Sequence, residues 1–337
     1  MSWLVIDAGN TAVKWAVGDR NMRRFMGVGI AAHGAIDGLD QRLATAWRGQ
    51  QVSSVYATSV TNEAVMRAID DAARSCFGVS VTWYRSQRHF EGHGASGGVA
   101  LINGYREPEQ LGADRWHALI ASCALHPGES LVIASAGTAT TVDCVRATPD
   151  AAAVFVGGVI APGVRLMRES LAQGTARLPL ARTETAARSV HATSTAEAIA
   201  GGVHFAQVGL IENVARAFAT ELVQADKPPP HLLLTGGGGQ ALVAPLTRAL
   251  RARGVVATVA LEQNLVLRGI ALRAQAEHVR AIEQRAVHAL RERGVVEPAA
   301  ADASRALPAS AAAPAADATP VPAGTTATAA HGSTVHG

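Results

Sequence analysis

Lysine is almost absent from this chain of 337 residues: Lys14 and Lys227 are its two lysines, and arginine supplies the other 28 basic side chains. The formal net charge is only +3, and the arginines are scattered among acidic residues. Binding of nucleic acid requires a clustered basic stripe, which this distribution does not provide. We therefore expect no nucleic-acid partner.

Cysteine and long apolar runs are also scarce. Cys76, Cys123 and Cys144 are odd in number and have no CxxC spacing, which indicates buried thiols in a reducing compartment. The twelve histidines show no HExxH or comparable metal spacing. The apolar runs have the length of a strand, and none reaches the roughly 20 residues that cross a membrane. Because Asp7 also interrupts the N-terminal apolar run, we expect a cytoplasmic protein with no membrane partner.

Strand and helix signals alternate along most of the chain. In the first part they predict strands at 3–6, 12–17, 24–30, 52–58 and 79–84, and helices at 38–48, 62–76 and 113–125. A Gly-rich polar connection occupies 85–110. The second part predicts a hairpin over 131–145, strands at 153–160, 231–235 and 255–259, and helices at 163–173, 195–220, 240–250 and 263–292.

These signals form two successive β-β-β-α-β-α units, which predict a duplicated α/β protein with a ligand cleft between two lobes. We place the lobes at 1–128 and 129–292. Residues 293–337 form a tail that becomes rich in alanine, proline and threonine from about Pro298. It has too few large apolar side chains to offset its ordering entropy, so we expect it to be disordered.

The first hairpin carries the strongest chemical signal. Asp7-Ala8-Gly9-Asn10-Thr11 forms a tight turn between two apolar strands, and Gly9 lets a bulky anion approach the backbone. Asp7 is placed to hold a hydrated Mg²⁺. Lys14 interrupts the returning strand in a chain that otherwise uses arginine, and a compact ammonium suits a phosphate. An ordinary hairpin with a surface lysine is the alternative.

Two further glycine-containing turns are candidates for phosphate binding. Ser135-Ala136-Gly137-Thr138 repeats the first hairpin 128 positions later, so the two turns are expected to clamp phosphates from both lobes. Thr235-Gly236-Gly237-Gly238-Gly239 ends a strand and opens a helix, whose N-terminus favours negative charge. A flexible strand-to-helix turn is the alternative for this second motif.

Three other elements have weaker signals. Gly112-Ala113-Asp114-Arg115 begins a helix, where an acid and a base are usually a cap and a solvated charge. A transfer enzyme, however, needs an acid close to its acceptor. The glycines of 157–163 indicate close backbone packing. Asp143 either touches the metal shell or satisfies backbone donors, and the sequence leaves both possibilities open.

Taken together, these motifs resemble the type III pantothenate kinases, members of the acetate kinase, sugar kinase, Hsp70 and actin superfamily. The resemblance spans residues 3 to about 272, in family order. It rests on Asp7–Lys14 (DxGNTxxK), Tyr105, Gly112–Arg115 (GxDR), Gly137–Asp143 (GTAxTxD), Gly157–Gly163 (GGxIxPG) and Thr235–Gly239. It implies a duplicated ribonuclease H-like α/β fold, as in the actin, Hsp70 and sugar kinase ATPases, with two lobes around a nucleotide cleft.

The resemblance also implies an activity: ATP-dependent phosphorylation of pantothenate to 4'-phosphopantothenate, the first step towards coenzyme A, in a homodimer whose acceptor pocket lies near the subunit boundary. Asp114 corresponds to the acid that accepts the hydroxyl proton, and Asp7 to the Mg²⁺ ligand. The matched ATP contacts are Asp7, Ala8, Gly9, Asn10, Thr11, Ala12, Val13, Lys14 and Thr138. The matched pantothenate contacts are Tyr105, Gly112, Ala113, Asp114, Arg115 and Thr195.

Ser135 departs from the family pattern. Many members carry an aspartate there that binds the monovalent cation they require, K⁺ or NH₄⁺. A neutral hydroxyl holds K⁺ more weakly than a carboxylate does. We therefore expect weaker or absent K⁺ binding at this position.

Two other functions remain open at the level of sequence. The first is a different small-molecule kinase on the same fold, since fold alone does not fix the substrate. The second is a non-catalytic accessory protein of transcription. The intact Asp7, Lys14 and Asp114 and the lack of an evident DNA-binding helix pair argue against that second function.

Overall fold

The computed structural model describes residues 2–19, 24–34, 36–92, 98–148, 152–176, 178–180 and 190–293. The chain divides into two compact units, residues 1–285 and 286–337. The sheets, the cavity and the sites discussed below all belong to the first unit. From residue 294 onward, the expected disordered tail lies outside the described residues.

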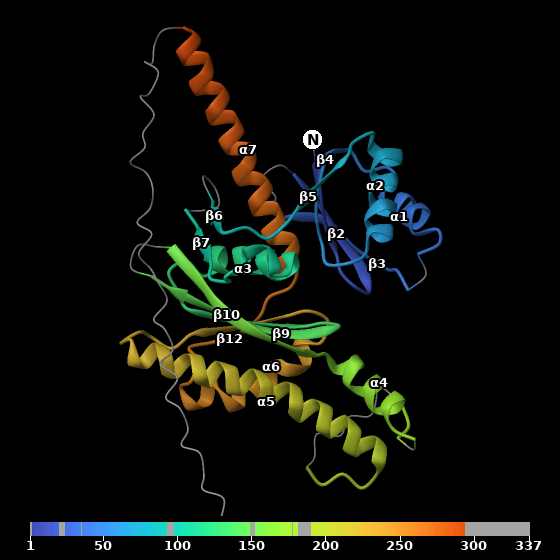
Figure 1. Ribbon diagram of the computed structural model, residues 1–337, viewed down its shortest axis with the longest axis vertical. Coiled ribbons are helices and arrows are strands. Elements are labelled where there is room, and N and C mark those ends of the chain that lie inside the picture. Colours follow the sequence, from blue (N-terminus) through green and yellow to red (C-terminus); the bar gives the residue numbers. More distant parts are fainter. Residues whose placement is uncertain are drawn as a thin grey trace, which may run out of the picture. The chain divides into compact units, whose positions relative to one another are not determined.

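The first sheet has five strands in the order β3-β2-β1-β4-β5 (Figure 1). The first three strands form an antiparallel meander, and β4 and β5 then continue the sheet parallel to β1. The strands are β1 (Ser2–Ala8), β2 (Ala12–Asp19), β3 (Phe25–Ala32), β4 (Val52–Ser59) and β5 (Val81–Tyr84).

Strand β1 is buried on both faces, as its unbroken apolar run predicts. Leu4 and Ile6 point to one face, where α1 (Leu39–Trp47) and α2 (Glu63–Phe77) pack. The Asn62 side chain caps α2 by accepting a hydrogen bond from the Val65 amide at 3.1 Å.

The second sheet has seven strands in the order β12-β11-β8-β9-β10-β7-β6. Its segment β10-β9-β8-β11-β12 repeats the strand order of the first sheet, which confirms the predicted duplication and the ribonuclease H-like α/β fold. The strands are β6 (His89–Glu91), β7 (Ala100–Asn103), β8 (Leu131–Ala136), β9 (Ala139–Ala147), β10 (Ala152–Pro162), β11 (His231–Thr235) and β12 (Val259–Leu261).

Helices cover both faces of this second sheet. The helix α3 packs on the face that carries Leu131 and Ile133, whereas α5 and α6 pack on the face of Val132 and Ala134 (Figure 1). In the described part of the chain, no helix combines the length and the apolar character needed to cross a bilayer. The helices of this half are α3 (Ala113–Leu125), α4 (Val164–Gly174), α5 (Thr195–Gln224), α6 (Gly239–Ala249) and α7 (Leu265–Glu292), with short 3₁₀ turns η2 (Pro108–Gln110) and η3 (Arg251–Arg253).

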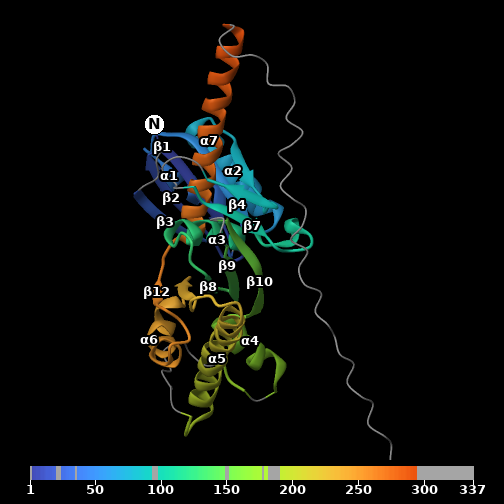
Figure 2. The same cartoon turned by 90° about the vertical axis from the view of Figure 1, so that its left-hand side faces the viewer.

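The two sheets exchange elements along the chain. The beginning of α7 packs against the first sheet, where Leu267 and Ile270 contact Trp3 and Tyr84 (Figure 2). Conversely, β6 and β7 join the second sheet although they come before α3. The boundary expected between residues 128 and 129 therefore falls between α3 and β8. The strands β6 and β7, which precede it, belong to the second sheet, and the beginning of α7, which follows it, packs against the first.

Two expectations from the sequence are wrong in detail. The connection 85–110 contains β6 and β7, because Leu101 and Phe90 supply enough apolar surface to pair at the sheet edge. The strand expected at 255–259 begins only at Val259. The Ala257 amide instead donates a hydrogen bond to the Pro230 carbonyl, which holds the preceding segment in a turn.

Gly269 sets how closely α7 approaches α3. A Cβ at this position would overlap the carbonyl oxygen of His117 on α3. We expect Gly269→Ala to lower the free energy of unfolding by about 1–3 kcal/mol, because the helices must move apart. Gly209→Ala in α5 is the matched control, since a Cβ there meets nothing within 4 Å. In this control the free energy of unfolding, measured with urea, should rise by about 0.4–1 kcal/mol. Equal effects of the two variants would contradict this account.

Candidate active site

The two hairpin turns predicted to face each other do meet. The hydroxyl oxygens of Thr11 and Thr138 lie 2.7 Å apart, although 127 residues separate them. Each turn is closed by a hydrogen bond from its glycine: the Gly9 amide donates to the Ala12 carbonyl three positions on, and the Gly137 amide to the Ala139 carbonyl two positions on, so the second turn is one residue shorter. The sequence repeat therefore corresponds to a repeat in structure.

A cavity of about 480 Å³ opens beside this contact, a size typical of sites for small-molecule ligands. Both hairpins, the start of α3 and the glycine turn after β11 contribute to its wall. The sequence-predicted residues that line it are Asp7, Gly9, Asn10, Thr11, Ala12, Lys14, Asp114, Arg115, Ser135, Gly137, Thr138, Asp143, Thr235, Gly236 and Gly237.

The carboxylates of Asp7 and Asp114 and the ammonium group of Lys14 are among the charged groups that line this cavity. Asp7 lies directly opposite Lys14 in the β1–β2 ladder. Burial raises the pKa of Asp7 to about 7, the charge of Lys14 opposes this shift, and the charge of Asp114 adds to it. Lys14 alone therefore does not compensate the buried negative charge.

The donor set fits a magnesium ion. Mg²⁺ prefers carboxylate oxygens and keeps several of its waters, so it needs only one or two protein ligands beside a phosphate. Asp7 offers a carboxylate on a rigid strand at the cavity wall, with its charged form disfavoured by burial. A divalent cation would stabilise that charged form. Asp7 is therefore suited to the metal role expected from the sequence.

Asp114 lies in the first turn of α3, where the helix dipole favours a negative charge. Its Oδ1 accepts a hydrogen bond from the Arg115 amide at 2.8 Å. Burial raises the pKa of Asp114, while the Arg115 amide and the charges of Arg115 and Lys14 oppose the shift. Gly112 leaves room for this carboxylate, because a Cβ there would come within 2.7 Å of Oδ1.

Arg115 is not the solvated charge that its position in a first helical turn suggests. Its side chain is 7% exposed, and its Nε donates to the Asp143 carboxylate oxygens at 3.1 and 3.2 Å. A second nitrogen also pairs with Asp143, and Nη1 donates to the Tyr105 hydroxyl at 3.0 Å. The carboxylate of Asp143 thus forms a buried ion pair, which neither open interpretation of this residue anticipated.

Glycines let the turns of the second sheet pack together. Gly236 has a φ of 83° and packs against the Ala136 backbone, so a side chain there is excluded by both conformation and space. Gly163 lies directly against Gly137 and Thr138, and its amide donates to the Thr138 carbonyl at 3.0 Å. The shaping role predicted for the glycines of 157–163 is confirmed.

Some predicted site residues do not line the cavity. Ala8 and Val13 point into the apolar core under the first sheet. Tyr105 stands behind Arg115 and packs on Phe155, and Gly112 and Ala113 shape the start of α3. Thr195 is exposed at the first turn of α5, and among the described residues no part of α5 lines this cavity.

Two parts of the cavity wall were not expected from the sequence. Gln263 and Asn264 line the cavity just before α7, and Asn264 adopts a φ of 60°. An asparagine before a helix tolerates that conformation, but the residue type alone does not predict a site. Val28 and Ile30 of β3 also line the cavity and are 54% and 66% exposed. Their apolar character predicts a strand with a buried face instead.

The buried ion pair provides a test of the site's construction. Asp143→Asn should lower the free energy of unfolding by about 3–5 kcal/mol, because Arg115 would lose its buried partner. Glu221→Gln is the matched control, because it breaks an exposed ion pair with Arg146, which lies on β9 like Asp143. The Glu221 side chain is 57% exposed and the Arg146 side chain 38%. That exposed pair should contribute less than about 1 kcal/mol. Similar losses for the two variants in chemical unfolding would disprove the assignment.

The comparisons with known proteins agree with these motifs. The sequence profile of the family described as Type III pantothenate kinase matches residues 3–217. The chain is 35% identical over 288 residues to the type III pantothenate kinase of Cupriavidus pinatubonensis, covering 79% of this chain and 96% of that protein. It is 38% identical over 256 residues to the type III pantothenate kinase of Burkholderia cenocepacia, covering 73% of this chain and 88% of that protein.

A third relative, the type III pantothenate kinase of Cupriavidus taiwanensis, is 34% identical over 296 residues and is covered over 98% of its length. These alignments span most of this chain and nearly the whole of each relative, and the family profile covers both hairpin turns and α3. The chain belongs to the type III pantothenate kinase family.

Proposed function

We propose that this chain transfers the γ-phosphoryl group of ATP to the primary hydroxyl of pantothenate, which yields 4'-phosphopantothenate and ADP. The observation that carries the proposal is the contact between Thr11 and Thr138, which brings two phosphate-binding turns to one cavity. Membership of the family and the acidic and basic groups in the same cavity support it.

The phosphates would lie against the two turns. Lys14 supplies a compact positive charge, Thr11 and Thr138 supply hydroxyl donors, and Gly9 leaves the backbone accessible. The remaining contacts carried over from the family are Ala8, Asn10, Ala12 and Val13, with Ala8 and Val13 acting through their backbone because their side chains are in the core. Mg²⁺ held by Asp7 would neutralise phosphate charge during transfer.

Asp114 would orient the acceptor hydroxyl and take its proton. Transfer of a phosphoryl group passes through a loose transition state, so positioning and charge neutralisation contribute most of the acceleration. A carboxylate whose pKa is raised by burial is a better base than an ordinary exposed one. The oxygen of pantothenate forms a bond to the γ-phosphorus as the bond to the ADP oxygen breaks.

The acceptor pocket would be built around Arg115, with Tyr105, Gly112 and Ala113 around it. Because Asp143 already neutralises much of the guanidinium charge, Arg115 would share its donors between Asp143 and the pantothenate carboxylate. Thr195 is away from the cavity wall of its own chain. A homodimer with its boundary beside the acceptor pocket would give Thr195 a place in that pocket.

Two further properties belong to the proposal. Three free cysteines, of which Cys123 and Cys144 are buried, support a reducing compartment, and we place the enzyme in the cytoplasm. Ser135 lines the cavity at the position where many family members use an aspartate for a monovalent cation. We propose that K⁺ binds weakly at this hydroxyl, and that any requirement for K⁺ is met through backbone oxygens.

The role of Asp114 is tested by Asp114→Asn. Turnover of pantothenate should fall by about two orders of magnitude or more, because the base is lost, while ATP affinity stays nearly unchanged. Asp40→Asn, an equivalent change in the first turn of α1 outside the cavity, is the matched control. Release of ADP with a panel of acceptors measures both rate and substrate choice.

The same variants can be tested in cells. The wild-type chain and Asp40→Asn should restore growth to bacteria that lack their own pantothenate kinase, and Asp114→Asn should not. Near-normal turnover of Asp114→Asn would remove this carboxylate from the mechanism. Faster turnover of a sugar or a short carboxylate than of pantothenate would refute the proposed substrate.

The cation proposal is tested by comparing initial rates in K⁺ and Na⁺ buffers. For the wild-type chain the ratio of rates should be small, and Ser135→Asp should increase it several-fold, because a carboxylate holds K⁺ more strongly. Ser135→Asn, which adds similar volume without charge, is the control. Strong activation of the wild type by K⁺ that Ser135→Ala abolishes would contradict the proposal.

A further inference from the structure

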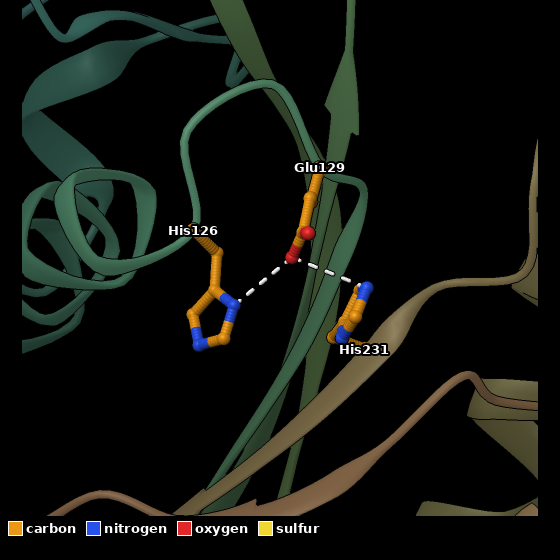
Figure 3. A group of neighbouring side chains, drawn as sticks. All are labelled: His126, Glu129 and His231. Atoms are coloured by element: carbon orange, nitrogen blue, oxygen red, sulfur yellow. Dashed lines mark hydrogen bonds and ion pairs between the residues drawn. The ribbon is translucent and has the colours of Figure 1, made fainter.

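Two imidazoles and a carboxylate converge at the end of β8 that is remote from the cavity (Figure 3). Glu129 lies between His126 and His231, and one carboxylate oxygen is 3.0 Å from Nδ1 of His126 and 3.1 Å from Nε2 of His231. The side chains are 22%, 42% and 20% exposed for His126, Glu129 and His231. The cluster is thus held in place and still accessible from solvent.

The backbone fixes the position of all three residues. His126-Pro127-Gly128-Glu129 forms a tight turn, closed by a hydrogen bond from the Glu129 amide to the His126 carbonyl at 3.3 Å. Pro127 and a φ of 76° at Gly128 are typical of a type II turn, which brings its first and last residues together. His231 begins β11 directly after three prolines, and its amide donates to the Ser130 carbonyl at 2.9 Å.

The spacing of the three ligand atoms suits a tetrahedral zinc ion. Zinc bonds of about 2.0–2.1 Å place neighbouring ligand atoms roughly 3.4 Å apart. The two imidazole nitrogens and the carboxylate oxygen all lie within 4.8 Å of one another, and two of the separations are 3.0 and 3.1 Å. Shifts of up to about 1 Å in these three ligand atoms would therefore bring them to the separations of a tetrahedral zinc site.

The hydrogen bond on the other side of one imidazole is an arrangement that metal-binding histidines use. The other ring nitrogen of His231, Nδ1, lies 2.8 Å from the Thr258 hydroxyl. Histidine ligands of metals usually donate this second N–H to an oxygen, which fixes the tautomer and leaves Nε2 free to coordinate. Imidazole ligands also favour zinc and related first-row ions over Mg²⁺.

We propose that His126, Glu129 and His231 bind a zinc-like first-row divalent ion, with water as a fourth ligand. The ion would connect the turn after α3 to the start of β11 and so stabilise the second sheet. At about 3.3 Å per residue, the site lies roughly 13–20 Å from Ser135, counted from Leu131, the partner of His231, and from Glu129. It is separate from the magnesium and phosphate positions of the cavity and does not depend on the proposed function.

The test uses the full-length chain without a histidine tag, stripped of metal with a chelator. Titration with Zn²⁺ against a chromogenic competitor should reveal one site, with at least tenfold weaker binding in His231→Ala and Glu129→Gln. Glu129→Gln is the sharper variant, because an amide keeps hydrogen-bonding capacity but loses the anionic ligand. Thr258→Val should weaken binding by about 10–100-fold, because it removes the hydroxyl oxygen that holds Nδ1 of His231.

His89→Ala is the matched control, since His89 is an exposed histidine on β6, outside this cluster. Zn²⁺ should raise the melting temperature of the wild type and of His89→Ala, and leave that of Glu129→Gln unchanged. Melting in the presence of chelator shows whether each variant is folded. Failure of the folded wild type to bind Zn²⁺ at micromolar concentration, or equal affinity in Glu129→Gln, would overturn the proposal.

Discussion

The contact between two backbone turns is the constraint on which the rest of the site depends. Thr11 and Thr138, one from each turn, lie within hydrogen-bond distance of each other. Gly163 and Gly236 pack against the second turn so closely that a Cβ at either position would meet a backbone oxygen. The glycine motifs, which lie far apart in the sequence, therefore serve one purpose: they let four segments approach one point.

Charge around that point is arranged in two groups with different surroundings. Asp7, Asp114 and Lys14 face the cavity, and burial raises the pKa of both carboxyl groups. Arg115 and Asp143, which also line the cavity, form an ion pair with each other. Asp7 and Asp114 together carry more negative charge than Lys14 balances, and a metal ion would stabilise that charge. The charges of Arg115 and Asp143, in contrast, balance each other. A cation bound at Asp7, as we propose, would therefore meet carboxylates that have no ion-pair partner of their own among the described residues, while the pair of Arg115 and Asp143 is already compensated.

The sequence predicts the fold well because its signals are local and repeated. The repeat of strand and helix signals predicts two related α/β halves, and the two similar turns predict that both face one cleft. The shared order of five strands in each sheet and the contact between Thr11 and Thr138 agree with these predictions. Contacts between distant segments are less predictable. Asp143 lies 28 residues from Arg115, and no spacing rule joins them. The cluster of His126, Glu129 and His231 has no metal motif, since its last member comes from a strand that pairs with β8 only in the folded chain.

The position of α7 has a consequence for how the protein is made. Trp3 and Tyr84 are covered by residues of α7, which is among the last parts of the described chain to leave the ribosome. Domains usually fold in order of synthesis, but here the N-terminal sheet lacks part of its apolar cover until the beginning of α7 has been synthesised. The growing chain must therefore avoid aggregation during that interval, and a nascent chain released before residue 265 would lack the α7 side chains that cover this part of the sheet.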